Sequence, residues 1–164
     1  MSVTVRPTAP EEAAMLHEIQ KAAFLPLYER YHDKGNPCLR GMEDITARIG
    51  SPHFRCFTIC EGDDVVGGAI YRCSGGGLSE GEYYLYRIYI KPGRQCKGIA
   101  QRAIALCERE FPGAVRFTVD FPEDLIKNQR CYEAAGFRDT GKRIAVEDGL
   151  TLACYEKRCG KTHI

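Results

Sequence analysis

The sequence predicts an α/β fold, with a mixed, mostly antiparallel central sheet of about seven strands flanked by helices. Strand-type and helix-type patterns follow one another in the order β-α-α-β-β-β-α-β-α-β-β. The strand-type segment from Glu82 to Ile90 leads through a Pro-Gly loop into a helix that begins at Gly98. The 164 residues, 44% of them apolar, are enough for one substantial core. We therefore expect residues 1–164 to form a single domain.

The first part of the chain is predicted to contain one strand and two helices. Val3 to Arg6 alternates as a short strand does, and apolar spacing predicts an amphipathic helix from Glu11 to about Phe24. Pro26 follows that helix, so we expect Leu27 to Asp33 to be an aromatic-rich link. A second, short helix is predicted from Met42 to Ile49.

The middle of the chain is predicted to carry the main strands of the sheet. Arg55 to Glu61 and Val65 to Cys73 read as a strand pair joined by a glycine-containing turn. Glu82 to Ile90 is a tyrosine-rich strand, and the helix after it extends from Gly98 to about Phe111. Val115 to Asp120 is expected to be the next strand.

The last part of the chain is predicted to form one helix and two strands. The helix follows Pro122, continues through Ala135 and ends at Gly136, a residue suited to the left-handed backbone that closes helices. The two strands are Phe137 to Ala145 and Leu150 to Glu156. No repeat or linker interrupts this order.

The overall charge points to no polyanionic partner. Lys plus Arg (23) nearly equals Asp plus Glu (22), which leaves a formal charge of +1. This balance gives no general electrostatic reason to expect binding to nucleic acid or to an anionic membrane. No apolar run is as long as a membrane span, and the N-terminus lacks a signal-peptide core. We expect a cytoplasmic protein.

The nine cysteines are odd in number and scattered along the chain. Several of them fall within apolar strand or helix patterns, where a thiol behaves as a small apolar group. No Cys-x-x-Cys pair occurs, and the histidines show no recurrent metal-ligand spacing. Reduced thiols are therefore expected, with no metal site.

The loop and helix after Ile90 suggest an anion-binding site. A helix that opens on small residues leaves its first N–H groups unpaired, and the positive end of the helix dipole lies there. These donors can bind a phosphate or pyrophosphate. Gly98 permits a close approach of the backbone, and Arg94 and Lys97 can add charge.

Two motifs resemble those of the GCN5-related N-acetyltransferase (GNAT) family. The first is Gln95-x-x-Gly98-x-Ala100, and the second is the block from Asn128 to Phe137, which contains Tyr-Glu-x-x-Gly-Phe. The resemblance covers roughly Val3 to Lys157. It implies a sheet splayed between its fourth and fifth strands, acetyl-CoA as co-substrate and, because relatives often dimerise, room for a homodimer.

The resemblance also implies which residues contact coenzyme A. Main-chain groups of the fourth strand would bind the acetyl and pantetheine parts, and the loop and helix start would bind the pyrophosphate. The cofactor contacts expected in this way are Ile88, Ile90, Gln95, Cys96, Lys97, Gly98, Ile99, Ala100, Gln101 and Asn128. Many relatives place the asparagine one helical turn earlier, where this chain has Leu125. The alternative for Asn128 is a helix cap or a surface amide.

Tyr132 matches the family tyrosine whose phenol lies near the thioester sulfur, which makes it the candidate general acid. The alternative is a packed helix tyrosine. The general base is less well defined, because Tyr84 occupies the position where several relatives carry a glutamate. Glu82 lies on the same side of that strand and could act through water; its alternative is a solvated charge at the strand end.

The amine acceptor is expected to contact Tyr84 and the link after the first helix. Tyr28 and Tyr31 offer stacking surfaces, and Asp33 offers a carboxylate for a cationic amine. The same residues could instead pack a lid. The acceptor implied is a primary amine on a small molecule or a peptide.

The sequence thus predicts acetyl transfer from acetyl-CoA directly to a primary amine, without a covalent enzyme intermediate. One alternative is an acyl-CoA-binding or sensing module that has lost catalysis; the presence of Tyr132 argues against it. Another is a nucleotide-binding regulator, which would lack the lysine and the acidic metal ligand of a phosphate loop.

Overall fold

A computed structural model describes residues 2–147 and 149–160 of the chain. Its strands form one sheet in the order β1-β2-β3-β4-β5-β7-β6. The strands are β1 (Val3–Pro7), β2 (Phe54–Glu61), β3 (Asp64–Arg72), β4 (Glu82–Ile90), β5 (Arg116–Pro122), β6 (Arg138–Glu147) and β7 (Leu150–Arg158). Every predicted strand is therefore present, with ends within two residues of those predicted.

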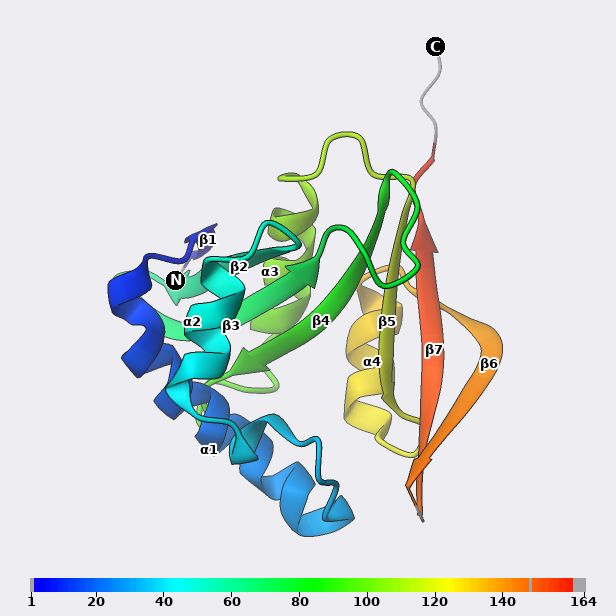
Figure 1. The fold of residues 1–164 in the computed structure, drawn as a ribbon, viewed down its shortest axis with the longest axis horizontal. Helices are drawn as coiled ribbons and strands as arrows, with labels where there is room; N and C mark the ends of the chain where they lie inside the picture. Colours follow the sequence, from blue (N-terminus) through cyan, green and yellow to red (C-terminus); the bar gives the residue numbers. More distant parts are fainter. Residues whose placement is uncertain (1, 148, 161–164) are drawn as a thin grey trace.

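The sheet is mixed because β4 and β5 are parallel, whereas the other neighbouring strands are antiparallel. Only the first residues of these two strands pair, Glu82–Tyr84 with Arg116–Thr118. Beyond them β4 and β5 separate, and Figure 1 shows the V-shaped opening between them. The splay expected between the fourth and fifth strands is confirmed.

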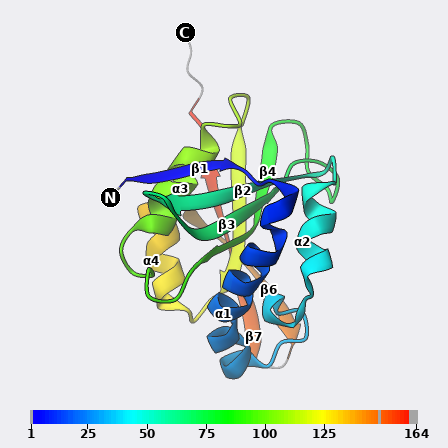
Figure 2. The same ribbon diagram turned by 90° about the vertical axis from the view of Figure 1, so that its left-hand side faces the viewer.

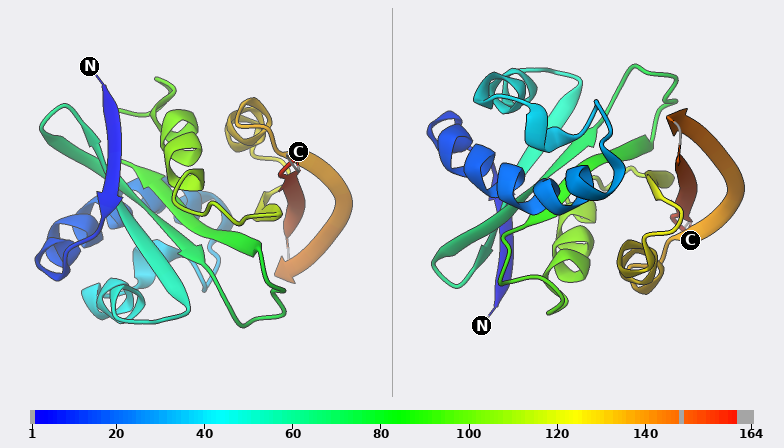
Figure 3. Two further views of the ribbon diagram at one scale, coloured as in Figure 1. Left: turned by 90° about the horizontal axis from the view of Figure 1, so that it is seen from above. Right: turned by 90° about the horizontal axis from the view of Figure 1, so that it is seen from below.

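Helices cover both faces of the sheet (Figures 2 and 3). On one face lie α1 (Ala13–Tyr31) and α2 (Met42–Ile49), and on the other lie α3 (Ile99–Glu108) and α4 (Ile126–Ala134). Short 3₁₀ turns, η1 (Pro10–Glu12) and η2 (Pro37–Leu39), flank α1 and the link that follows it. None of the described helices is long and apolar enough to cross a membrane.

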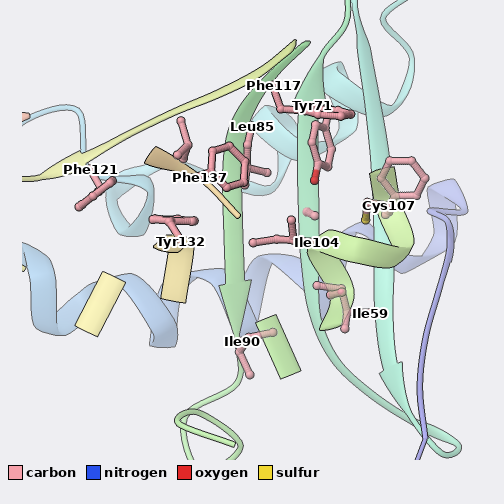
Figure 4. Packing of buried hydrophobic residues seen from close by; sticks show 14 of the residues in the cluster. Ile59, Tyr71, Leu85, Ile90, Ile104, Cys107, Phe117, Phe121, Tyr132 and Phe137 are labelled. Atoms are coloured by element: carbon pink, nitrogen blue, oxygen red, sulfur yellow. The ribbon is translucent and has the colours of Figure 1, made fainter. Parts of the chain in front are cut away.

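The core has two parts, one on each face of the sheet. The larger cluster packs α3 and α4 against the strands and is rich in aromatic side chains, several of which Figure 4 shows. Tyr132 of α4 belongs to it and lies next to Phe121 and Phe137, with ring centroids 5.1 and 6.0 Å away. The smaller cluster joins α1 and α2 to Tyr89 of β4.

The first helix is longer than predicted. We expected it to end near Phe24 because Pro26 follows, but Pro26 lies inside α1. A proline removes one backbone N–H from the helix and crowds one preceding carbonyl, yet the other hydrogen bonds of the helix can persist. Leu27 and the residues after it therefore continue the helix as far as Tyr31 and do not form a link.

Contacts at its C-terminal end help to hold this extension. The N–H of His32 donates to the carbonyl of Tyr28 over 2.7 Å and closes the last turn. The Tyr31 hydroxyl and the Arg30 guanidinium both donate to the carboxylate of Asp124, just after β5. The end of α1 is thus tied to the far side of the splay.

A β-bulge in β4 changes which side chains face α2. In the register with β3, Arg87 is opposite Ile70 while Leu85 is opposite Tyr71, so Tyr86 is the extra residue. A bulge of this kind redirects the side chains that follow it. As a result Tyr86 and Arg87, although consecutive, both contact α2 through hydrogen bonds.

Candidate active site

Two adjoining cavities lie at the splay between β4 and β5. The larger has a volume of about 480 Å³ and extends over α4 and the start of α3; the smaller, of about 270 Å³, lies between β4, β5 and α1. Five residues line both cavities: Phe24, Leu27, Ile88, Asn128 and Tyr132. Since these residues line both, the two cavities adjoin at Tyr132.

The larger cavity includes the start of α3. Gly98 caps this helix with a left-handed backbone (φ 79°), and Cys96 just before it is also left-handed (φ 63°). The first backbone bond into the helix runs from the N–H of Arg102 to the carbonyl of Gly98, over 3.1 Å. Within the described chain no backbone acceptor is recorded for the N–H groups of residues 95–101. These donors and the helix dipole can bind an anion.

Polar side chains fix the loop before α3. The Gln95 side chain donates to the carbonyl of Ile90 over 2.8 Å and so joins the loop to the end of β4. Arg94 lines the cavity but is paired with Glu61 and Asp64, at 2.7 and 2.8 Å. Lys97 does not line the cavity. The backbone, more than these cations, therefore supplies the anion-binding groups.

Of the expected cofactor contacts, all except Lys97 line the larger cavity. They are Ile88, Ile90, Gln95, Cys96, Gly98, Ile99, Ala100, Gln101 and Asn128. Ile88 and Ile90 lie on the part of β4 that no longer pairs with β5, so peptide groups along this edge are open to hydrogen bonding. This edge, the start of α3 and Tyr132 all line the same cavity.

Tyr132 is held by the aromatic core but still borders both cavities. Its residue exposure is 7%, and burial raises the pKa of its phenol well above the usual value. Its hydroxyl is not among the fully buried polar atoms that lack a partner in the described chain. At neutral pH this phenol is therefore protonated and can donate a proton to a group in the cavities.

Asp120 and Arg87 are functional candidates that the sequence analysis missed. They are the charged residues among the described ones that line the smaller cavity, Asp120 from β5 and Arg87 from β4. The Tyr84 hydroxyl donates to the carboxylate of Asp120 over 3.1 Å. Burial, with Asp120 beside it, raises the pKa of Tyr84. The signal available in the sequence was the alternation of β5, which sets Asp120 on the face opposite Phe117, Val119 and Phe121.

Several predicted site residues do not reach the cavities. Glu82 stands at the start of β4, where it accepts from the Ser79 N–H at 3.0 Å and pairs with Arg116 at 3.7 Å. It is six residues from Ile88, or roughly 20 Å along a strand. The structure therefore does not bring Glu82 to the place where the cavities meet.

The aromatic residues expected to border the acceptor lie at the end of α1. Tyr28, Tyr31 and Asp33 line neither cavity. Tyr31 is engaged with Asp124, and Asp33 accepts from the Asn36 side chain at 3.3 Å. Because α1 continues through Pro26, its residues Phe24 and Leu27 face the cavities, and contact of the other three with an acceptor stays a prediction.

No group of three or more histidine, cysteine or acidic side chains suited to a metal ion occurs within residues 2–147 and 149–160.

A family model described as "Acetyltransferase (GNAT) family" matches residues 14–137. A search among curated proteins gives no match.

Solved structures with similar folds include several acetyltransferases. The PaiA N-acetyltransferase from Thermoplasma acidophilum, in complex with coenzyme A, has a TM-score of 0.76 at 15% identity, over 97% of this chain and 100% of that one. An acetyltransferase from Thermus thermophilus has a TM-score of 0.73 at 20% identity, over 97% of this chain and 98% of that one. The ribosomal-protein-S18-alanine N-acetyltransferase from Escherichia coli has a TM-score of 0.74 at 12% identity, over 99% of this chain and 97% of that one. At these identities the likeness is one of fold.

Proposed function

Because the chain belongs to the GNAT acetyltransferase family, we propose that it moves the acetyl group of acetyl-CoA directly to a primary amine of a small molecule or peptide. The observation that carries this proposal is the meeting of two cavities beside Tyr132. One cavity has the donors that a pyrophosphate needs, and the other has a carboxylate that an amine needs. Transfer requires the two substrates to meet at such a junction.

In this proposal coenzyme A occupies the larger cavity. Its pyrophosphate accepts hydrogen bonds from the N–H groups of residues 95–101, where the left-handed backbone of Gly98 brings the chain close. Its pantetheine follows the open edge of β4 at Ile88 and Ile90, and Asn128 contacts it from α4. The fold neighbour from Thermoplasma acidophilum was solved with coenzyme A bound, which supports this choice of ligand.

The amine enters through the smaller cavity and attacks the thioester carbonyl carbon. Asp120, an acidic residue that lines that cavity, accepts the proton that the amine nitrogen loses, directly or through a water molecule. The carbon–sulfur bond then breaks, and Tyr132 donates its phenolic proton to the leaving thiolate. The amide and free coenzyme A are the products; Asp120 then releases its proton to bulk water, and Tyr132 regains one from it.

Glu82 has no part in this scheme, because its carboxylate is held by Ser79 and Arg116 away from both cavities. Asp120 takes the role for which Glu82 was considered. Tyr84, which donates to Asp120, is proposed to orient that carboxylate.

The second candidate is an acyl-CoA-binding or sensing module without catalysis. It needs the larger cavity only, and so gives no role to the smaller cavity with its Asp120 carboxylate, or to the contact of the two cavities at Tyr132. Release of thiol from acetyl-CoA, measured with a panel of primary amines, separates the two. The proposed enzyme releases one thiol for each acetylated amine, whereas a sensing module binds acetyl-CoA and releases none above the uncatalysed rate.

We propose the cytoplasm as the setting for this reaction, since the near-neutral charge of +1 favours neither a nucleic acid nor a membrane partner. A homodimer is compatible with the proposal. Sedimentation of the purified protein with and without coenzyme A distinguishes monomer from dimer.

A further inference from the structure

The smaller cavity brings together two charges of opposite sign. Arg87 reaches it from β4 and Asp120 from β5, on the two strands that separate at the splay. Among the described residues that line it, the others are uncharged. Asp120 has a role in the proposed reaction, as the group facing the amine, but Arg87 has none.

Arg87 is held firmly through one end of its guanidinium. Its Nη1 donates to the Gln20 side chain at 3.0 Å and to the carboxylate of Asp44 at 2.8 Å. Gln20 is itself fully buried and donates to the carbonyl of Pro37 over 3.3 Å. The arginine is therefore oriented before any ligand arrives, which lowers the entropy cost of binding.

The rest of the guanidinium has no protein acceptor in the described chain. The hydrogen bonds recorded for Arg87 all leave from Nη1, although its side chain is only 6% exposed. Neither Nε nor Nη2 is among the fully buried polar atoms without a partner, so both remain accessible. Two adjacent donors of this kind match the two oxygens of a carboxylate.

Arg87 shares Asp44, its ion-pair partner in the described chain, with a second arginine. Asp44 pairs with Arg87 at 2.8 Å and also with Arg48 at 3.5 Å, which gives two cations for one anion. The Tyr86 hydroxyl accepts from Arg48 at 2.7 Å but adds no charge. Asp44 therefore compensates Arg87 only in part, and Asp120, the acidic residue that lines this cavity in the described chain, is proposed to face the amine. A carboxylate bound in the cavity would pair with the rest of the guanidinium.

We propose that the amine acceptor also carries a carboxylate, and that Arg87 binds it while Asp120 faces the amine. This inference rests on the proposed function and names its substrate class as small amino acids. The cavity, at about 270 Å³, is slightly smaller than the roughly 300–1,000 Å³ typical of pockets for drug-sized ligands. It therefore suits an acceptor of amino-acid size.

The test compares free amino acids with their carboxamides as acceptors, by thiol release from acetyl-CoA. A carboxamide has the more weakly basic amine and hence more of the reactive neutral form at pH 7, so chemistry alone favours the amide. Recognition by Arg87 should reverse this order and give the acids a kcat/KM advantage of about 10- to 100-fold, as expected for a charged hydrogen-bonded contact.

The variant Arg87→Gln should lower the ratio of acid to amide kcat/KM by about 10- to 100-fold, mainly through a higher KM for acids. Arg87→Lys keeps the positive charge but loses the two adjacent N–H donors of the guanidinium. It should therefore lower the ratio of acid to amide kcat/KM by less than Arg87→Gln does. The control is Arg55→Gln, since Arg55 is a partly exposed arginine that lines neither cavity.

Two results would overturn the inference and leave the proposed function in place. One is wild-type protein that acetylates amides or simple amines as well as acids. The other is equal loss on acids and amides in both folded Arg87 variants, which would mean that Arg87 only fastens β4 to α1 and α2. If Arg87→Gln does not fold, the wild-type comparison and Arg87→Lys still decide. Wild-type protein that binds acetyl-CoA but acetylates no amine would overturn both proposals.

Discussion

The hydroxyl of Tyr84 on β4 donates a hydrogen bond of 3.1 Å to the carboxylate of Asp120 on β5, close to the point where the two strands separate. Tyr84 is the last residue of β4 that pairs with β5, and Asp120 lies two residues beyond its partner Thr118. The bond therefore spans the beginning of the splay and sets Asp120 at the wall of the smaller cavity.

Replacing Asp120 with asparagine should remove the proposed base but keep an oxygen that can accept from Tyr84. We expect kcat/KM for amines to fall by about 10²- to 10⁴-fold. The affinity for acetyl-CoA, measured by calorimetry, should change little, because Asp120 does not line the larger cavity. Asp63→Asn, in the turn between β2 and β3, is the control. An Asp120→Asn enzyme as active as the control would remove Asp120 from the mechanism.

Tyr132→Phe tests whether the Tyr132 phenol donates a proton to the thiolate of the leaving coenzyme A. The ring and its contacts with Phe121 and Phe137 should remain, so the fold should survive while the hydroxyl is lost. We expect kcat to fall by about 10²- to 10⁴-fold, with a smaller fall for an acyl donor whose thiol leaves more easily. Tyr83→Phe is the matched control, because Tyr83 packs on Phe111 and lines neither cavity. Full activity of Tyr132→Phe on its best amine would show that the ring only packs.

Gly98→Glu tests the pyrophosphate site at the start of α3. The substitution puts a negative charge beside N–H groups that are proposed to bind an anion, so the affinity for coenzyme A should drop at least about tenfold. A side chain at Gly98 is also strained by its left-handed backbone. Gly93→Glu controls for both effects, because Gly93 has a similar backbone (φ 94°) but lines neither cavity. Equal calorimetric affinities in the two variants would exclude the site.

The ion pair of Arg6 and Glu12 makes the free energy of unfolding depend on pH in the acid range. The Arg6 guanidinium, with the Ala9 N–H and the Thr58 hydroxyl, lowers the pKa of Glu12 from 4.5 to about 2. A carboxyl whose pKa is lower in the folded state stabilises the protein fully above its unfolded pKa and progressively less as the pH falls towards 2. Arg6 is half exposed, so the contribution at pH 7 is on the order of 1–2 kcal/mol.

Urea unfolding of Glu12→Gln and of the wild type measures this contribution. The free energy of unfolding should be lower in the variant at about pH 7, and the difference should narrow below about pH 4. Glu11→Gln, next to it and exposed, should show little difference at either pH. A Glu12→Gln difference that stays constant with pH would mean that packing, and not charge, accounts for it.

Most of the fold follows from local patterns. The strand from Glu82 to Ile90 has the predicted bounds, and so does the helix from Met42 to Ile49, because alternation and apolar spacing reflect burial directly. The end of α1 could not be predicted from the local pattern. Pro26 disfavours a helix locally, whereas the contact of Tyr31 with the distant Asp124 favours one. Contacts between residues far apart in sequence are not visible in local propensity.

The site was predicted only where motifs mark it. The helix start at Gly98 and the position of Tyr132 follow from spacing, and both line the larger cavity. Arg87 and Asp120 are brought together by the bulge at Tyr86 and by the splay, neither of which any single segment reveals. Tyr28, which was expected in a link after the first helix, lies on α1 and lines neither cavity, and its contact with an acceptor stays a prediction.

The central claim, direct transfer at the junction of the two cavities, is tested most directly by the intact mass of the protein. Cys96 and Cys131 line the larger cavity and are the nucleophiles that a covalent route would use, although burial raises the pKa of the Cys131 thiol. The protein is mixed with excess acetyl-CoA without an amine, and its mass is recorded before and after a reactive amine is added. The proposed mechanism predicts an unchanged protein mass throughout, and acetylated amine and free coenzyme A in equal amounts only after the addition. A gain of one acetyl group by the protein before the addition, lost again on transfer to the amine, would contradict it.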